Sequence, residues 1–490
     1  MGVYKLYKQA YKTSIILCEI LFIMKKEIHF KNFGKVKDAR IRMRPFTMIT
    51  GHNSSGKSFI TRALYSIFHT LNQDLMAVFL KNILNSILLS IESINENLVR
   101  KTVKDESALI ELQTEFYHFR TVISEQFDLV DIYQEREILS TLEPAIKELS
   151  SRTEALYKQF SNGKGTKLIS VEQHFNALQY NVSQLRHASE NWSPFYAQEL
   201  KSNLKNNLLK NFQINSLKQI SFVSEQTSIE FDSKENGEIL IENGDLDAFF
   251  ISFSTISEIQ ELYNVIYLES PIYFKLRNTL REARFQNSIF NRKNLINPVP
   301  KFFYDTDRLL SSQFLEDNIP IELLEIIGKI EKGIDGKLSI DNRDNIVFQD
   351  NELPNVEIPF NLVSSGISNL GIVALLLKKN ILTKGSFLFI DEPELNLHTE
   401  WQHLMLEVLV DLSLAGINVM VASHSLDMVL RLQNIVENFE NQEKIDDLFS
   451  LNRLSKNGTT LESEGILQDI RNAKADLGKP YVDLLKQRLP

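Results

Sequence analysis

The sequence has very little cysteine. Its single cysteine, Cys18, excludes a disulfide framework and a cysteine-based zinc cluster. This composition fits a reducing compartment, so we expect a cytoplasmic location. Disorder is excluded as well, because 43% of the 490 residues are hydrophobic, which is enough for two or three compact units.

The chain also lacks an excess of basic residues. The chain has 54 lysines and arginines against 63 aspartates and glutamates, a formal net charge of −9. A protein that holds nucleic acid unaided usually presents a broad basic surface. Direct DNA binding through a local basic stripe stays possible, but the composition does not favour it.

Long apolar runs are missing too. The run "KTSIILCEILFIM", Lys12 to Met24, is too short to span a bilayer and contains Glu19. No small-residue cleavage site precedes the Lys25-Lys26 pair, which argues against a secretory signal. We therefore expect no membrane partner, and we interpret residues 1–23 as an N-terminal extension with a possible upstream start. A native protein whose major species begins at Met1 by mass spectrometry would contradict the upstream start.

A phosphate-binding pattern stands near the N-terminus, in "FTMITGHNSSGKSFITRAL", Phe46 to Leu64. The pattern G-x-x-x-x-G-K-[ST] lies between a β-prone run and an amphipathic helix expected over Ser58 to Phe68. Its backbone N–H groups surround phosphates, Lys57 reaches the β/γ oxygens and the Ser58 hydroxyl holds Mg²⁺. The alternative is a Gly/Ser surface turn with a stray lysine. The predicted nucleotide-binding residues are Gly51, His52, Asn53, Ser54, Ser55, Gly56, Lys57 and Ser58.

A second metal ligand is expected from "GSFLFIDEPELNLHTEWQ", Gly385 to Gln402. The uninterrupted apolar run Phe387 to Ile390 predicts a parallel strand that is covered on both faces. Asp391 then emerges at the carboxyl edge of the sheet, where it can bind Mg²⁺, and Glu392 can activate the attacking water. Taken alone, an apolar run followed by Asp-Glu is also a common ending of a surface strand.

Another strand is expected in "INVMVASHSLDMVL", Ile417 to Leu430, and it ends at Ser423 and His424. A histidine at this strand end can touch the γ-phosphate and sense its loss. The alternative is a histidine that caps the next helix. We predict Glu392, His424 and Lys57 as the catalytic residues.

A second anion site is predicted in "NLVSSGISNLGIVALLLKK", Asn361 to Lys379. Ser364, Ser365 and Gly366 precede a helical pattern, so their hydroxyl and N–H groups lie at a helix N-terminus. Because the first anion site serves the chain's own nucleotide, this second one can complete the pocket of a partner subunit.

These motifs, in this order, resemble the ABC-type ATPase superfamily, in particular the SMC-like branch with the OLD (overcoming lysogenisation defect) and RecF-type ATPases. The match covers Walker A (Gly51 to Ser58), the signature (Ser364 to Gly366), Walker B with its glutamate, a D-loop-like Glu394 to His398, and the switch histidine His424. "NVIYLESPIYF", Asn264 to Phe274, is similar to a recurrent strand of that branch. Ser365 departs from transporters, which carry glycine there.

The resemblance implies an α/β fold: an ABC-type P-loop NTPase head with an antiparallel β lobe and an inserted helical, coiled-coil-like hairpin domain. It also implies ATP and Mg²⁺ as cofactors and a slow ATP hydrolase. Strands of the β lobe are expected in Ile220 to Phe253, with a turn at "SKENGE", and a hairpin around Asn342 to Asp344.

Lys57 and Asp391 lie much further apart than a compact core requires, so we expect a large insertion between them. Apolar residues at 3.5-residue spacing predict two helices joined by a turn at Ser161 to Thr166, although ordinary core-facing helices share this pattern. The stripes are Leu142, Ile146, Leu149, Leu156 and Phe160, then Val171, Phe175, Leu178, Val182 and Leu185. The expected domains are residues 1–23 (extension), 24–70 (head with Walker A), 71–215 (helical insertion), 216–440 (head with signature, Walker B and switch histidine) and 441–490 (tail completing the head).

Within the superfamily, the chain looks like AriA, the ATPase subunit of the PARIS anti-phage system. That resemblance implies a homodimer through a nucleotide sandwich and higher homo-oligomers. It also implies a separate toxic TOPRIM-type nuclease effector, such as AriB, released by a phage trigger protein. No segment of TOPRIM size follows His424, so we expect the effector on another chain. The alternatives are a RecF/SMC-like ATPase that binds DNA directly in repair or chromosome maintenance, and a scaffold with negligible turnover.

Overall fold

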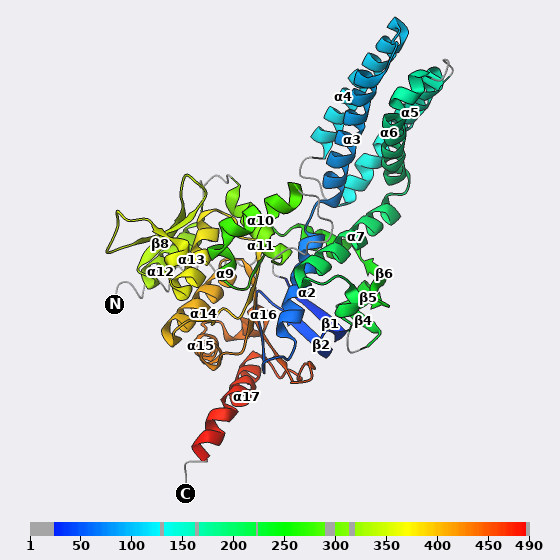
Figure 1. Ribbon diagram of the computed structural model, residues 1–490. Coiled ribbons are helices and arrows are strands. Elements are labelled where there is room, and N and C mark those ends of the chain that lie inside the picture. The colour runs from blue at the N-terminus through cyan, green and yellow to red at the C-terminus, as the bar shows by residue number, and fades with distance from the viewer. Residues whose placement is uncertain are drawn as a thin grey trace. The chain divides into compact units, whose positions relative to one another are not determined.

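The computed structural model describes residues 24–127, 132–161, 166–221, 224–289, 299–312 and 319–486 (Figure 1). The expected extension, residues 1–23, and most of the turn expected between the two helical stripes lie outside the described residues. The chain divides into two compact units, one formed by Met1–Asn72 with Leu204–Pro490 and the other by Gln73–Asn203.

A five-stranded parallel sheet forms the centre of the first unit, with the strand order β13-β3-β12-β11-β7. Parallel strands place their carboxyl ends at one edge, so segments far apart in the sequence meet there. This sheet confirms the predicted α/β class. The strands are β3 (Phe46–Gly51), β7 (Val265–Leu268), β11 (Phe387–Asp391), β12 (Asn418–Ser423) and β13 (Phe449–Leu454).

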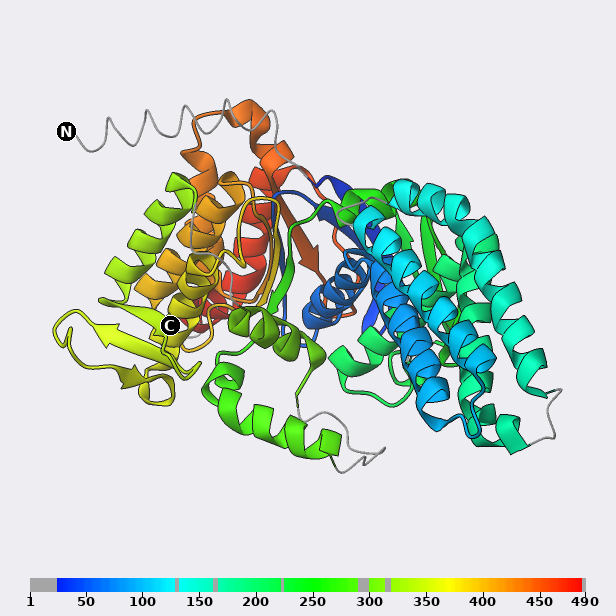
Figure 2. The same cartoon turned by 90° about the horizontal axis from the view of Figure 1, so that it is seen from above.

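Helices cover this sheet (Figure 2). Phe387 and Phe389, two residues apart on one face of β11, lie with ring centroids 5.4 and 5.9 Å from Phe68 of α2. That contact explains why β11 is apolar throughout, because its other face is covered as well. The helices of this unit are α2 (Lys57–Leu71), α8 (Phe253–Gln260), α9 (Ile272–Lys275), α10 (Arg277–Ile289), α11 (Lys301–Ser311), α12 (Ile321–Gly333), α13 (Ser365–Lys378), α14 (Thr399–Leu414), α15 (Leu426–Glu437), α16 (Ile445–Leu448) and α17 (Ile466–Lys486), with 3₁₀ turns η2 (Leu217–Gln219), η3 (Phe360–Leu362) and η4 (Gln442–Lys444).

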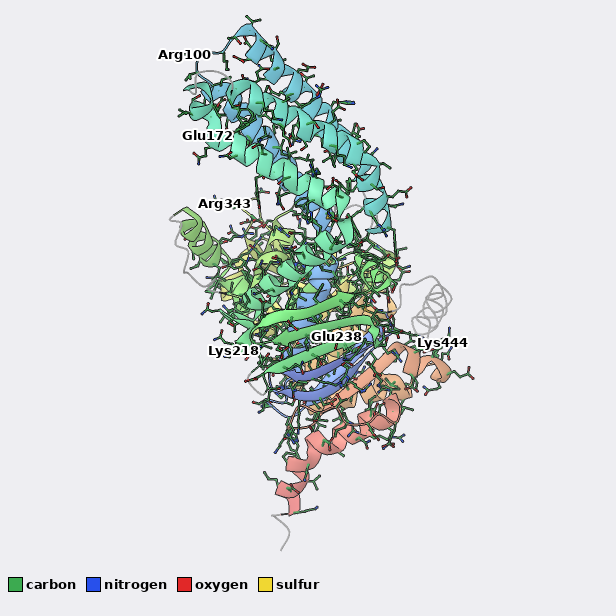
Figure 3. The ribbon with its side chains drawn as sticks, turned by 90° about the vertical axis from the view of Figure 1, so that its right-hand side faces the viewer. Arg100, Glu172, Lys218, Glu238, Arg343 and Lys444 are labelled. Carbon is green, nitrogen blue, oxygen red and sulfur yellow. The ribbon has the colours of Figure 1, made fainter. Side chains whose placement is uncertain are left out.

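An antiparallel sheet of five strands forms the predicted β lobe, in the order β2-β1-β4-β5-β6 (Figure 3). The turn expected at "SKENGE" is confirmed, because Glu230 of β4 pairs with Glu238 of β5 and the chain therefore reverses between them. Strand β5 is counted from Ser233, inside this reversal, and Asp232 there has a positive φ. The next turn, between β5 and β6, lies at Asn243-Gly244, where φ is also positive. The strands are β1 (Lys26–Phe33), β2 (Val36–Met43), β4 (Gln226–Phe231), β5 (Ser233–Glu242) and β6 (Asp245–Ile251).

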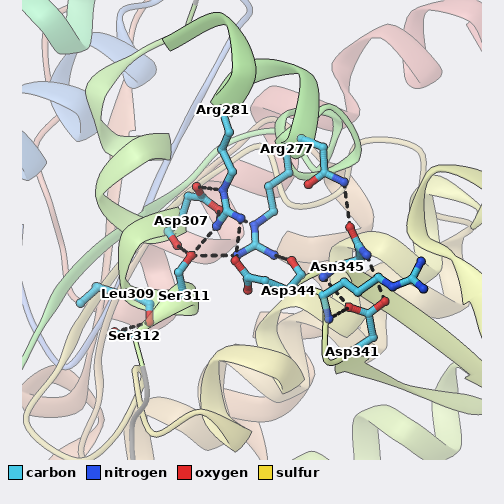
Figure 4. Close-up of polar contacts among 11 residues, drawn as sticks. Arg277, Arg281, Asp307, Leu309, Ser311, Ser312, Asp341, Asp344 and Asn345 are labelled. Atoms are coloured by element: carbon cyan, nitrogen blue, oxygen red, sulfur yellow. Dashed lines mark hydrogen bonds and ion pairs between the residues drawn. The ribbon is translucent and has the colours of Figure 1, made fainter. Parts of the chain in front are cut away.

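A third, small sheet contains the hairpin predicted around Asn342 to Asp344. Its strands are β8 (Gly336–Ile340), β9 (Ile346–Asp350) and β10 (Ile358–Pro359), and Asp344 in the turn has φ 62°. An ion-pair cluster fixes this turn (Figure 4). Arg277 and Arg281 of α10 both bind Asp307 of α11 and Asp344 of the turn. Arg277 and Asp307 are buried, so each charge needs the other.

The second unit is helical. All ten apolar residues of the two predicted stripes are buried, and α5 packs on α6. Among the described residues, α3 is the one helix long and apolar enough by length and composition to cross a membrane, and 44% of that window is buried here. The unit consists of α3 (Leu75–Asn97), α4 (Val103–Gln126), α5 (Ile132–Ser161), α6 (Thr166–Glu190) and the first part of α7 (Trp192–Phe212).

The C-terminal tail contains β13 and α17. Helix α17 begins at Ile466, runs through Pro480 and ends at Lys486. Proline removes one backbone donor from the interior of this helix. Upstream of it, β13 pairs with β3 and so becomes an edge strand of the central sheet.

Candidate nucleotide-binding site

The phosphate loop joins β3 to α2, and both of its glycines are sterically required. Gly56 caps α2 with φ 101°, and a Cβ there would lie 2.6 Å from Val36 Cγ2. A Cβ on Gly51 would lie 2.4 Å from the Leu454 carbonyl oxygen. Real Cβ atoms do not approach so closely, so the glycine spacing in the sequence follows from how tightly the loop is enclosed.

Lys57 is the buried cation of this loop. Its Nζ donates hydrogen bonds to the carbonyl oxygens of Gly51 at 2.9 Å and His52 at 3.1 Å. Burial lowers the pKa of Lys57, while the charges of Glu392, Asp391 and Glu394 raise it. Carbonyl acceptors in its own loop hold the ammonium in place, and phosphate oxygens are stronger acceptors for it.

Asp391 ends β11 with only 3% of its surface exposed. The Tyr267 hydroxyl donates to its Oδ2 at 3.3 Å, but its Oδ1 has no hydrogen-bond partner among the described residues. Burial raises the pKa of Asp391 to about 6, and the side chain of Ser58, which is close enough to interact with the carboxylate, acts in the opposite direction. Ser58 and Asp391, predicted as metal ligands, are therefore neighbours.

These two residues fit a magnesium ion. Mg²⁺ is usually held by one or two carboxylates, with phosphate oxygens and water completing its shell. In the described part of the chain, no three His, Cys, Asp or Glu residues form a cage of their own. When Mg²⁺ is bound by protein, phosphate and water together, the protein has to supply only one or two oxygens. The Asp391 oxygen without a hydrogen-bond partner in the described chain and the neighbouring Ser58 hydroxyl can supply them.

Glu392 and His424 also lie together. His424 Nδ1 is 3.4 Å from Glu392 Oε1 and 3.3 Å from Glu394 Oε1. Glu392 has φ 50°, a strained conformation for a non-glycine residue, and its N–H donates to the Ala422 carbonyl. The Ala422 carbonyl belongs to β12, the strand that His424 follows, so β12 holds this conformation.

Glu394 organises the end of β12. Its Oε1 accepts hydrogen bonds from the Ser423 hydroxyl at 2.8 Å and from the His424 N–H at 2.9 Å. Sequence reasoning placed Glu394 only in a D-loop-like segment and missed this role. It also missed the role of Tyr267, although its strand was noticed in "NVIYLESPIYF".

The signature lies at the start of α13. Ser364 is the N-cap, and its hydroxyl accepts from the Ile367 N–H at 3.3 Å. Ser364 is exposed and Ser365 is half-buried, whereas a Cβ on Gly366 would lie 2.6 Å from the Trp401 ring. In the described chain, no hydrogen bond joins these three residues to the phosphate loop. Lys275 Nζ donates a hydrogen bond to the carbonyl of Val363 and so holds the residue that directly precedes the signature.

A family model described as AAA ATPase domain matches residues 24–429. No curated protein matches the sequence.

Solved structures with a similar fold include SMC heads. The SMC head domain from Thermotoga maritima is 10% identical, with 83% of this chain and 92% of that chain covered and a TM-score of 0.33. The Smc head domain with an extended coiled coil from Pyrococcus furiosus, bound to the C-terminal domain of ScpA, is 12% identical, with 95% and 100% covered and a TM-score of 0.31. At these TM-scores the likeness carries no argument about the site.

Proposed function

Because the chain belongs to the AAA ATPase domain family, we propose that it binds and hydrolyses ATP at the carboxyl edge of the parallel sheet. We further propose that it serves as a nucleotide-dependent oligomeric scaffold in anti-phage defence, which holds and releases a separate toxic nuclease effector. The observation that carries the ATPase assignment is the unpartnered oxygen of buried Asp391 beside Ser58.

Each residue of the site has a chemical task in this proposal. Lys57 and the N–H groups of residues 51–58 bind the phosphate oxygens, as phosphate loops do. Bound Mg²⁺, held by Ser58 and Asp391, supplies positive charge to the phosphates. Glu392 accepts a proton from the attacking water, and His424, within 3.4 Å of Glu392, contacts the γ-phosphate.

A second copy of the chain is the proposed partner at the signature. Leu362 and Leu395 are 72% and 41% exposed, and Asn369 of α13 donates to the Leu395 carbonyl at 3.0 Å. The D-loop-like segment and α13 are thus joined by a hydrogen bond, and exposed leucines lie in the D-loop-like segment and just before the signature. Apolar side chains around a helix N-terminus suit a dimer in which Ser365 and Gly366 meet the neighbour's terminal phosphate.

The effector part of the proposal draws support from the likeness to AriA and from the helical unit. On α4, Val103, Ile110 and Tyr117 are 82%, 53% and 44% exposed. Their seven-residue spacing places them along one side of the helix, apart from the buried Leu109, Leu112 and Phe116. An exposed apolar stripe of this kind suits a helical or extended segment of a partner protein.

The test is co-expression with the product of the adjacent open reading frame. We expect stoichiometric copurification that persists for Glu392→Gln, which keeps ATP, and is lost for Lys57→Ala. Substituting aspartate for Val103 and Ile110 should release the effector without changing ATP hydrolysis. The absence of any complex with wild type would contradict the scaffold proposal. A salt-sensitive gel shift of duplex DNA by the purified chain alone would favour the RecF/SMC-like alternative.

A further inference from the structure

A cavity lies where β3 and β13 end, beneath α17. Its volume is about 240 Å³, and Gly51 and His52 of the phosphate loop form part of its wall. Pockets for drug-sized ligands usually measure about 300–1,000 Å³, so this cavity suits a smaller group. Most of the remaining wall is apolar and consists of Leu454, Leu461, Ala473 and Leu477.

The strand register places this cavity on the face of the sheet opposite to α2. Phe389 of β11 contacts α2 and pairs with Met420, which in turn pairs with Thr47. Successive side chains of a strand alternate between its two faces, so Thr50, three residues after Thr47, points to the other face. Arg453 pairs with Thr50 and points the same way. The cavity, which both residues line, is therefore separate from the site at Ser58 and Asp391.

Two buried polar groups of the cavity have unused hydrogen-bonding capacity. Thr50 is 2% exposed, and its Oγ1 has no hydrogen-bond partner in the described chain. The Arg453 side chain is 12% exposed, and its guanidinium donates to Asp476 at 3.3 Å and to the Glu462 carbonyl at 3.4 Å. Hydrogen bonds between an ammonium or guanidinium and a carboxylate are usually about 2.7–2.9 Å long. Arg453 therefore lacks a close acceptor.

The charged residues of the lining favour a ligand with one negative charge. Arg453 and Lys456 are cations, and Asp476 is the one carboxylate of the described lining. Lys456 is exposed, and its ammonium has no hydrogen-bond or ion-pair partner within the described ranges. One excess cation balances a carboxylate, whereas a phosphate monoester carries about −1.5 to −2. The fork of a guanidinium also matches the two oxygens of a carboxylate.

We propose that this cavity binds an apolar group that carries one carboxylate. The carboxylate accepts hydrogen bonds from Arg453 and Lys456, and the Thr50 hydroxyl donates to it as well. The apolar body packs against the leucines of the wall. Both a free aliphatic acid and the last residue of a polypeptide have this chemistry. The inference goes beyond the proposed function, because this ligand binds without a nucleotide.

The experiment uses the full-length, nucleotide-free protein and isothermal titration calorimetry. The probes are isocaproate, a free acid, and an acetylated alanine peptide that ends in leucine. The control for each probe is its neutral amide. We expect a carboxylate to bind and its amide to bind at least about tenfold more weakly, because a hydrogen bond to a charged group is lost. Tighter binding of isocaproate indicates a free acid as the source, and tighter binding of the peptide indicates a polypeptide end.

Variants of the cavity give the second comparison. Arg453→Gln should weaken carboxylate binding by about tenfold or more. Ala473→Phe should abolish it, because the larger side chain fills the cavity. The matched control is Arg471→Gln, which should keep wild-type affinity. Arg471 is also paired with a carboxylate, Glu437 at 4.0 Å, but does not line the cavity.

If Arg453→Gln does not fold, as judged by circular dichroism, Lys456→Gln gives the decision. Lys456 is exposed, so we expect this variant to fold and to bind about twofold to fivefold more weakly, the range of an exposed ion pair. No binding of either carboxylate, equal binding of acid and amide, or an equal loss in Arg471→Gln would overturn the inference. None of these measurements uses ATP, so they stand apart from a failure of the proposed nucleotide site.

Discussion

At the carboxyl edge of the parallel sheet, buried polar atoms stand without partners, among them Asp391 Oδ1 and Ser55 Oγ. The two helical stripes, by contrast, consist of apolar residues. Elsewhere in that unit, buried Asp105 accepts hydrogen bonds from Thr102 and buried Thr153 donates to the Ser150 carbonyl at 2.8 Å, while the Tyr196 hydroxyl is buried without a partner among the described residues. An unbonded buried polar atom costs about 1–3 kcal/mol. The sheet edge is therefore arranged for a ligand, whereas the helical stripes stabilise the unit by their own packing.

The largest expected effect comes from removing the loop's cation. Lys57→Ala should lower ATP hydrolysis by at least about 10³-fold, since charge stabilisation is the main contribution in phosphoryl transfer. The same change at Lys147, an exposed lysine of the helical unit, should leave hydrolysis unchanged. A phosphate-release assay on both variants checks this, and equal ATP affinity in wild type and Lys57→Ala would contradict the assignment.

Glu392→Gln separates binding from chemistry at the same edge. We expect hydrolysis to fall by about 10²- to 10³-fold, because a general base is removed. The amide keeps the size of the side chain, so ATP affinity and assembly should persist. Single-turnover assays and equilibrium dialysis measure the two quantities separately, and a parallel loss of both would argue against this role.

A substitution that creates a cavity in the helical unit should lower the stability of that unit and leave ATP hydrolysis almost unchanged. Phe175 is fully buried between α5 and α6, where its ring centroid lies 5.5 Å from that of Phe160. Phe175→Ala should destabilise this unit by about 3–5 kcal/mol. ATP hydrolysis should change little, because the nucleotide site belongs to the other unit. Urea unfolding followed by circular dichroism, with hydrolysis measured in parallel, checks this.

The smallest expected effect is a pH dependence of the folding stability of the nucleotide-free protein, which arises from the Asp391 carboxylate. The native pKa of Asp391, about 6, exceeds its ordinary 3.8, so the native state binds the proton more tightly than the unfolded state. Stability should fall as pH rises from about 4 to about 6, by up to about 3 kcal/mol, and then stay level.

The matched variant for that pH dependence is Asp391→Asn. Since the amide carries no charge, the nucleotide-free variant should be more stable than wild type at pH 8 and should lose ATP hydrolysis. Thermal melts of both proteins at pH 4 and pH 8 supply the comparison. A wild-type protein whose stability rises over the same pH range, relative to the variant, would refute the assigned shift.

Many of the site residues at the carboxyl edge of the parallel sheet could be predicted, because each belongs to a short continuous motif. The phosphate loop is one short segment, and Asp391 and His424 each follow an apolar run that reads as a strand. Arg62 and Thr61 could not be predicted, because their partners Glu269 and Tyr267 lie 207 and 206 residues away in the sequence. Residue identity alone does not tell which strands become neighbours.

The helical stripes were predictable for a different reason. Leu142 and Ile146, like Val171 and Phe175, repeat with the period of the helix itself, so the buried face is visible in the sequence. The "SKENGE" turn was predictable because turn-forming residues are a local signal as well. The chain reverses there, with Glu230 of β4 paired to Glu238 of β5.

The central claim is that two copies of the chain share each nucleotide, and mixing two inactive variants tests it most directly. Lys57→Ala removes the phosphate loop's cation, and Ser365→Arg blocks the signature. If the sites are shared, a mixed dimer holds one intact site, so an equal mixture should recover about a quarter of wild-type ATP hydrolysis. A mixture as inactive as its components, although native mass spectrometry shows mixed dimers, would contradict the account.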